Sequence, residues 1–185
     1  DMSTATWTVI DTRSNETEWP SNGYPRRIYR SNRDYTNAYS AIRFEITANN
    51  GDNDWMCIGN IDCLPFFSGG DLYPDGGFAD VATNGTATVS PEASLWYNDQ
   101  SGTRWFDDKC AEDNNRGIFH LATSANNKGA MLAAYTFARP QVVNAYRICG
   151  TMQNWPSRCP KAWTLLGSND YNPADADNMT NATWT

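Results

Sequence analysis

Residue types that carry out acid–base or nucleophilic chemistry are sparse in this chain. Its only histidine, His120, is flanked by two apolar residues, which is typical of a packed or surface side chain. Two carboxylate pairs, Glu16 with Glu18 and Asp107 with Asp108, are of the type that glycosidases use, but Asn-rich surroundings predict solvated loops there. The sequence has no Gly-x-Ser-x-Gly elbow, His-Glu-x-x-His pair, phosphate-cradling glycine loop or dinucleotide fingerprint. We therefore expect a protein that is not an enzyme.

Hard oxygen ligands are more frequent and favour Ca²⁺ over other metals. They cluster in Asp52-Asn-Asp54, Asp107-Asp108 and Asp175-Ala-Asp177. A zinc site is poorly supported, because there is a single histidine and no Cys-x-x-Cys pair. We expect no cofactor beyond a structural calcium at Asp107, Asp108 or their neighbours; the alternative is that these carboxylates are solvated turn residues.

Cysteines and glycosylation sequons indicate an oxidising, extracellular setting. The five cysteines are Cys57, Cys63, Cys110, Cys149 and Cys159, so one is left over from intramolecular pairing. Cys149 and Cys159 flank a segment with Trp and Pro between two expected strands, which makes them the preferred pair. Four Asn-x-Thr sequons begin at Asn15, Asn84, Asn178 and Asn181.

Composition narrows the class of partner. The chain has 185 residues with 8 Trp, 9 Tyr and 7 Phe, which is enough aromatic surface for one well-packed domain. A net charge of −7 argues against nucleic-acid binding, which needs basic patches, and against anionic membrane surfaces. No apolar stretch approaches the length needed to cross a bilayer, so membrane insertion is not expected.

Short alternating strands dominate the sequence. In residues 39–47, Ile42, Phe44 and Ile46 alternate with Arg43 and Glu45, which predicts one buried and one polar face. Further strands are expected at 7–11, 55–64, 142–148 and 162–166, with turns rich in Asn, Gly and Pro between them. Many short strands without a long helical period favour an all-β sandwich or barrel.

A glycine-rich, weakly apolar segment at 68–84 is the best linker candidate, and it divides the chain into 1–67 and 85–185. A second organisational feature is a recurrence: residues 178–185 nearly repeat residues 1–8. Five of the eight positions are identical, including the string Ala-Thr-Trp-Thr. This recurrence predicts one period of a tandem array or a subunit that joins head to tail. The alternative is chance similarity in a Thr-rich sequence.

Strings in the two halves carry a family resemblance. The second half offers Trp105-Phe-Asp-Asp108, Tyr135-Thr-Phe-Ala-Arg-Pro140, Val142-Val-Asn-Ala-Tyr-Arg-Ile148 and Arg158-Cys-Pro-Lys-Ala-Trp-Thr-Leu-Leu-Gly-Ser-Asn-Asp170. The first half offers Trp7-Thr-Val-Ile-Asp-Thr-Arg13, Tyr39-Ser-Ala-Ile-Arg-Phe-Glu-Ile46 and Ile58-Gly-Asn-Ile-Asp-Cys-Leu64. With the second half placed first, the series resembles a discoidin-like domain (coagulation factor 5/8 type C, galactose-binding-like). The resemblance implies a jelly-roll β-sandwich in permuted order, with 1–67 as its C-terminal half, 68–84 as a linker and 85–185 as its N-terminal half.

Half a sandwich would expose an apolar face and open strand edges. Residues 1–67 therefore either fold back onto 85–185 of the same copy or complete the next copy. We expect completion in trans or in tandem, with few contacts between 1–67 and 85–185 of one copy. The permuted order also implies that Cys110 pairs with Cys57 or Cys63.

Sugar binding is the commonest role of the family that the chain resembles, and it uses loop aromatics as platforms. The candidates here are Trp19, Tyr24, Trp96 and Trp155; their alternative role is packing beneath long loops or in an interface. Trp7 and Trp163 occupy alternating strand positions and are expected in the core. The family's calcium loop corresponds to 105–108, with Asp108 in place of its glycine, and Asn60 replaces a Glu that assists there.

The terminal recurrence favours a repeating structural subunit of an extracellular filament or cell-surface array, assembled head to tail from copies of itself. The competing hypothesis is a secreted carbohydrate-binding module whose partners are glycans. A third is an accessory domain of a larger enzyme that acts on glycosides. The recurrence separates the first from the other two, because a free lectin domain has no reason to begin in mid-fold.

Overall fold

The computed structural model describes residues 5–21, 25–31, 36–52, 55–64, 86–89, 118–120, 131–150 and 155–172, and all structural statements concern these residues. The predicted linker at 68–84 lies outside them. Apart from one 3₁₀ turn over Pro156–Arg158, every regular element in the described ranges is a β-strand. Within them, no helix has the length and apolarity to cross a membrane.

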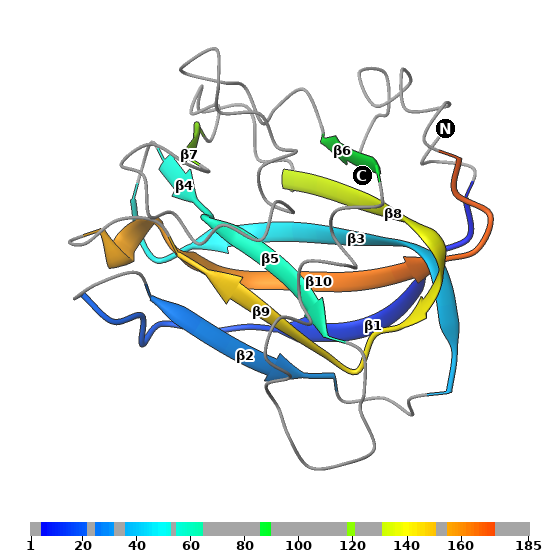
Figure 1. The fold of residues 1–185 in the computed structure, drawn as a ribbon. Helices are drawn as coiled ribbons and strands as arrows, with labels where there is room; N and C mark the ends of the chain where they lie inside the picture. Colours follow the sequence, from blue (N-terminus) through cyan, green and yellow to red (C-terminus); the bar gives the residue numbers. More distant parts are fainter. Residues whose placement is uncertain are drawn as a thin grey trace.

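Two antiparallel sheets form the body of the molecule (Figure 1). The first has the order β1 (Thr8–Arg13), β10 (Pro160–Ser168), β3 (Ala38–Asn49), β8 (Met131–Val142) and β6 (Thr86–Val89). The second has the order β2 (Arg26–Arg30), β9 (Ala145–Cys149) and β5 (Asn60–Leu64). A separate pair joins β4 (Trp55–Cys57) to β7 (Ile118–His120). The predicted all-β sandwich is therefore confirmed.

The core lies between the five-stranded and the three-stranded sheets. Ile42, Phe44 and Ile46 of β3 are all buried there, as their alternation predicts, and they pack with Trp163 of β10 and Tyr146 of β9. Phe44 and Tyr146 meet edge to face across the two sheets, with ring centroids 5.5 Å apart. Burial of these large side chains supplies the main favourable term in folding.

Strands from the two parts of the sequence are interleaved in both sheets. β3 from the first part lies between β10 and β8 from the second, and β9 from the second part lies between β2 and β5 from the first. The expectation of few contacts between 1–67 and 85–185 of one copy is therefore wrong. Pairing within one chain forms the hydrogen bonds that the open strand edges need. It avoids the loss of translational and rotational freedom that association between chains incurs.

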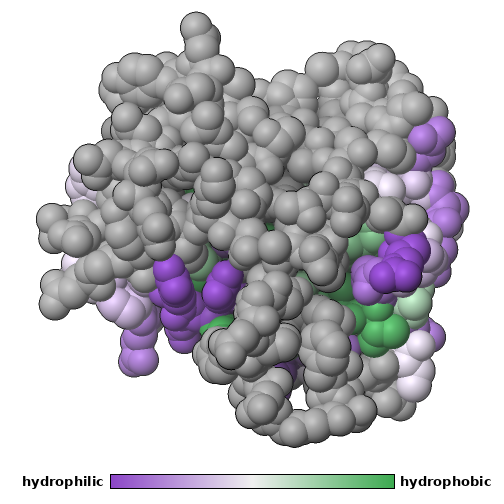
Figure 2. Space-filling view, in the orientation of Figure 1, coloured by the Kyte–Doolittle hydropathy of each residue, from purple (hydrophilic) through white to green (hydrophobic). Residues whose placement is uncertain are grey.

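A smaller cluster covers the outer face of the five-stranded sheet. Ala41 and Arg43 alternate with the core residues of β3 and therefore point to its other face. Ala134 of β8 is the cross-strand partner of Arg43. Trp7 and Tyr171 pack over this face. The part of the surface coloured in Figure 2 combines hydrophilic residues with a small hydrophobic patch. The exposed large hydrophobic side chains in the described ranges are Ile28 and Trp155.

Candidate functional site

A buried polar network joins the two sheets where β1 faces β9. The Tyr146 hydroxyl donates a 2.7 Å hydrogen bond to Oδ2 of Asp11, and it accepts one of 2.8 Å from the indole Nε1 of Trp163. Nε of Arg13 also donates to Asp11 Oδ2, at 2.7 Å, and its Nη2 donates to the carbonyl of Arg30 in β2. Asp11 comes to face the interior because β1 is irregular between Val9 and Asp11, which shifts its register against β10.

Electrostatics within this network follow from burial. Desolvation disfavours the phenolate, so burial raises the pKa of Tyr146, and the neighbouring Asp11 carboxylate raises it further. Burial by itself lowers the pKa of Arg13, but the hydrogen bond and charge of Asp11 outweigh it and the net pKa is raised. Tyr146 therefore stays protonated and Arg13 stays charged at neutral pH, which suits a fixed hydrogen-bonded bridge.

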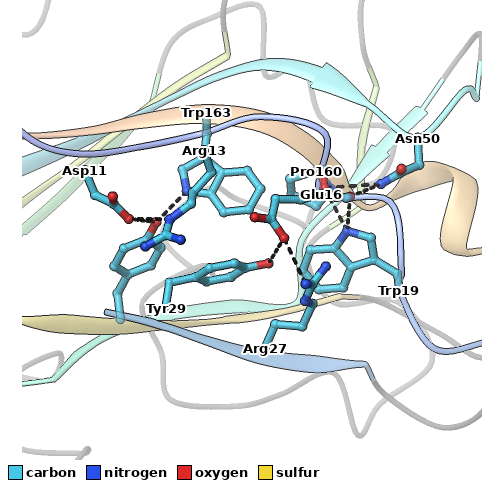
Figure 3. A network of polar contacts seen from close by, with 10 residues as sticks. Asp11, Arg13, Glu16, Trp19, Arg27, Tyr29, Asn50, Pro160 and Trp163 are labelled. Atoms are coloured by element: carbon cyan, nitrogen blue, oxygen red, sulfur yellow. Dashed lines mark hydrogen bonds and ion pairs between the residues drawn. The ribbon is translucent and has the colours of Figure 1, made fainter. Parts of the chain in front are cut away.

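A second set of polar contacts continues in the loop that follows β1 (Figure 3). Oε2 of Glu16 lies 2.9 Å from Nη2 of Arg27 and accepts a long 3.5 Å hydrogen bond from the Tyr29 hydroxyl. The indole Nε1 of Trp19 donates to the carbonyls of Glu16 (3.0 Å) and Pro160 (2.8 Å). The Asn50 side chain donates to the same two carbonyls, at 3.0 and 3.2 Å. These contacts fasten the loop to β2, to the turn after β3 and to β10, so this second set of contacts has a structural role.

An aromatic rim lies at one end of the sandwich, where the turn after β3 meets the 3₁₀ turn. Trp155 is 37% exposed and the Arg158 guanidinium lies 4.0 Å from its ring centroid. Nε of Arg158 pairs with Oδ2 of Asp52 at 2.9 Å, and the Asp52 amide donates to the Ser157 carbonyl at 3.2 Å. A partly open tryptophan beside a fixed Arg–Asp pair can stack one face of a sugar ring and bind its hydroxyls.

A third arrangement holds the segment before β1, and we call it the Trp7 clamp: Ala41, Arg43, Ala134, Asp170 and Tyr171 around Ala5–Trp7. The Arg43 guanidinium lies 4.4 Å from the Trp7 ring centroid, and the Trp7 and Tyr171 centroids are 5.4 Å apart with their planes tilted by 46°. The Thr6 amide donates to both carboxylate oxygens of Asp170, at 2.8 and 3.0 Å. Ala5 packs against the same apolar cluster.

The string Gly-Ser-Asn-Asp at the end of β10 positions this clamp. Oδ1 of Asn169 accepts from the Ser40 amide at 2.8 Å, and its amide group donates to the Ala38 carbonyl at 3.1 Å, which fixes the turn to β3. The Ser168 hydroxyl donates to Oδ1 of Asp170 at 2.6 Å. This bond and the Thr6 amide hold the pKa of Asp170 below its ordinary value, because both stabilise the charged carboxylate. The carboxylate is thereby oriented towards the backbone of the docked segment.

The predicted sugar platforms differ in their exposure to solvent. Trp19 is 5% exposed and its ring is packed inside the sandwich, so its prediction as an open platform is wrong. Its indole N–H finds main-chain acceptors, and this draws the ring inward. Trp155 is exposed as a platform requires, while Tyr24 and Trp96 lie outside the described residues.

The cysteines correct the predicted pairing. Cys149 is disulfide-bonded, but Cys159 is not its partner. Side chains alternate along a strand, so Ile148 enters the core beside Cys159 and Cys149 leaves β9 on the opposite face. The predicted pairing depended on the short segment between positions 149 and 159, which does not indicate on which face of a strand each cysteine lies. The predicted pairing of Cys110 with Cys57 involves side chains outside those described, and Cys63, the alternative partner, forms no disulfide.

Most predicted metal and glycan positions fall outside the described ranges. These are Asp107, Asp108, Asn84, Asn178 and Asn181. Within the described ranges, no group of three or more His, Cys, Asp or Glu side chains is placed to hold a metal ion. Asn15 is exposed and has a positive φ of 58°, a left-handed conformation that asparagine tolerates in turns.

Sequence reasoning missed the Asp11–Tyr146 bridge and the stacking of Arg43 on Trp7. Asp11 and Arg13 both stand in the string quoted for the family resemblance, and an aspartate between Ile10 and a strand arginine was a usable signal for a buried ion pair. Arg43 gave no such signal, because alternation placed it on the polar face. Trp7 and Tyr171 cover that face of the sheet, so the Arg43 side chain is only 8% exposed.

No family model, curated protein or solved structure matches the chain at a significant level.

Proposed function

We propose that the chain is a repeating structural subunit of an extracellular filament or cell-surface array, joined head to tail with copies of itself. One observation carries the proposal: Ala5–Trp7 is docked on the outside of a sandwich whose core is already complete, and Ala-Thr-Trp-Thr recurs at 182–185. A surface-docked segment can leave without opening the core. A second copy of the same string gives each subunit both a docking site and a ligand for it.

Other features support this proposal. The described polar contacts link residues of different strands and turns, which is the kind of internal cross-linking that a module under tension needs. A disulfide at Cys149 fits an oxidising, extracellular setting, as do the four sequons. We also propose that the sandwich is a discoidin-like jelly roll in permuted order, which the sequence strings around Tyr39, Val142 and Trp163 support.

Sedimentation velocity and negative-stain imaging test the proposed function. The full chain, secreted from a eukaryotic host, should form larger species as its concentration rises, and the images should show linear chains of globules. A chain that sediments as a monomer from micromolar to millimolar concentration would exclude this function.

The exposed Trp155 favours a second candidate, a carbohydrate-binding module. The rim of Trp155, Arg158 and Asp52 offers a ring face and fixed polar groups at one end of the sandwich. A glycan array would identify ligands, and Trp155→Ala should then abolish binding. Ile28→Ala is the matched control, because Ile28 is equally exposed, at 37%, but lies in β2. Equal loss of binding in both variants would argue against a platform at Trp155.

A further inference from the structure

We propose that the Trp7 clamp of one copy is a receptor for residues 182–185 of a second copy, which take the place of the first copy's Ala5–Thr8. This inference rests on the proposed function and deepens it, because it names the contact through which copies join. In this view the observed docking of Ala5–Trp7 on its own chain is the unassembled state of the contact.

The contacts of the clamp are ones that the second string can reproduce. Asp170 binds the docked segment through the backbone amide of Thr6, and Thr183 occupies the corresponding position in the recurrence. Arg43 and Tyr171 contact the indole ring of Trp7, and Trp184 has the same ring.

The flanks of the string fit the clamp in the same way. Ala5 packs on the small apolar cluster, and Ala182 has the same side chain. Thr8 opens β1 opposite Gly167 of β10, and Thr185 matches it. The positions that differ between residues 1–8 and 178–185 all precede Ala5, so they lie outside the described contacts.

The chemistry of the clamp favours a Trp-containing strand over other ligands. Burial and the loss of hydration lower the pKa of Arg43, while Glu45 pairs with its guanidinium and helps to keep it charged. A charged guanidinium on an indole face is a strong cation–π pair when it is partly desolvated. The clamp thus recognises one aromatic ring and one backbone N–H group.

A second copy is the occupant to which we commit. Trp7 already fills the clamp of its own chain and leads directly into β1, so the second string finds a vacancy only where Ala5–Thr8 has departed. When this replacement occurs, the main core cluster between the sheets stays intact because it excludes Trp7, and Trp184 takes over the contacts of Trp7 with the smaller cluster. Replacement of a segment by the same string from another copy resembles domain swapping, which is a low-cost route to assembly.

The first test empties the clamp in the full chain with the double variant Trp7→Ala/Trp184→Ala, so that neither string of the chain fills it, and adds the synthetic peptide Asn178–Thr185. The peptide should raise the melting temperature of this variant in a saturable way, and the peptide Asp1–Thr8 serves as the positive control. A peptide carrying Trp184→Ala should bind at least about tenfold more weakly, the ratio that corresponds to a loss of about 1.4 kcal/mol. If Asp1–Thr8 binds and Asn178–Thr185 does not, the clamp rejects the second string and the proposal is overturned.

The second test needs no emptied clamp and decides the matter if the double variant fails to fold. Sedimentation of the full chain is compared with that of Trp184→Ala, with Trp155→Ala as the matched tryptophan control. Trp184→Ala should weaken self-association at least about tenfold, and the control should leave it unchanged. Association that survives Trp184→Ala would overturn the clamp exchange and leave the structural-subunit function standing. If the peptide binds but the wild-type chain never associates, both proposals fail.

Discussion

The Tyr146 hydroxyl in the three-stranded sheet donates a 2.7 Å hydrogen bond to the buried carboxylate of Asp11 in the five-stranded sheet. The two residues are 135 positions apart in the sequence and come from different parts of the chain. The hydroxyl also accepts from Trp163, so one oxygen atom links β9, β1 and β10. This bridge fixes how the two sheets sit against each other, which burial of apolar surface alone does not specify.

Tyr146→Phe should destabilise the protein by about 1–3 kcal/mol. The change leaves the ring in place but removes a donor to Asp11 and leaves the buried indole N–H of Trp163 without its acceptor. Urea unfolding, followed by tryptophan fluorescence, measures the difference. Tyr39→Phe is the matched control, since no hydrogen bond involves the Tyr39 hydroxyl within the described part of the chain, and its effect should be below about 0.5 kcal/mol.

Alkaline pH should weaken the fold through the same tyrosine and through Tyr29. Burial raises the pKa of both hydroxyls above the ordinary value of 10.0, so the folded state holds its protons where the unfolded chain releases them. The stabilisation is present below about pH 10 and is lost as pH rises towards the raised values. The urea concentration at the unfolding midpoint should therefore decrease as the pH rises from about 10 to about 11.5, and it should decrease less steeply in Tyr146→Phe. A midpoint that stays level to pH 11.5 would contradict this account.

Acid should loosen the Trp7 clamp before it unfolds the core. The Ser168 hydroxyl and the Thr6 amide hold the pKa of Asp170 below 3.8, so the contact is intact above about pH 4 and is lost as pH falls through that lowered pKa. The Thr6 amide resonance should titrate with a midpoint below 3.8 while core resonances remain unchanged. Asp170→Asn should abolish this titration. A midpoint above 3.8 would show that the Thr6 amide resonance reports the protonation of a group other than Asp170.

Much of the fold was predictable from local patterns. The alternation in residues 39–47 predicted which side chains of β3 enter the core, and Ile42, Phe44 and Ile46 do so. The strings around Tyr146 and Trp163 likewise gave strands, because period-two burial is a local property. Whether the two halves join within one chain was not predictable, since that depends on long-range pairing and not on any residue near the seam.

The candidate site was less predictable, for a physical reason. Exposure depends on what covers a side chain, and Trp19 and Trp155 stand in similar loop-like sequence although one is buried and the other open. The main-chain carbonyls of Glu16 and Pro160 draw the Trp19 indole inward, and Pro160 is 141 positions away. Cys149 and Cys159 show the same limit, because their faces depend on the strand phase of β9 and not on loop length.

The interleaved strands predict that neither half of the chain folds alone. β3 supplies β10 and β8 with a partner along most of its length, and β9 has first-half strands on both sides. Residues 85–185 without 1–67 should therefore be insoluble, because Trp163, Leu165 and Ile148 lose the surface against which they pack. Residues 1–67 and 85–185 produced together as separate chains should form a soluble 1:1 complex.

Trp163→Ala in the intact chain should cost about 3–5 kcal/mol, the range for deleting a large buried aromatic side chain. Solubility, mass photometry and urea unfolding of the complex measure these effects, and a cooperative melt of isolated 85–185 would show that β3 is dispensable for the sandwich.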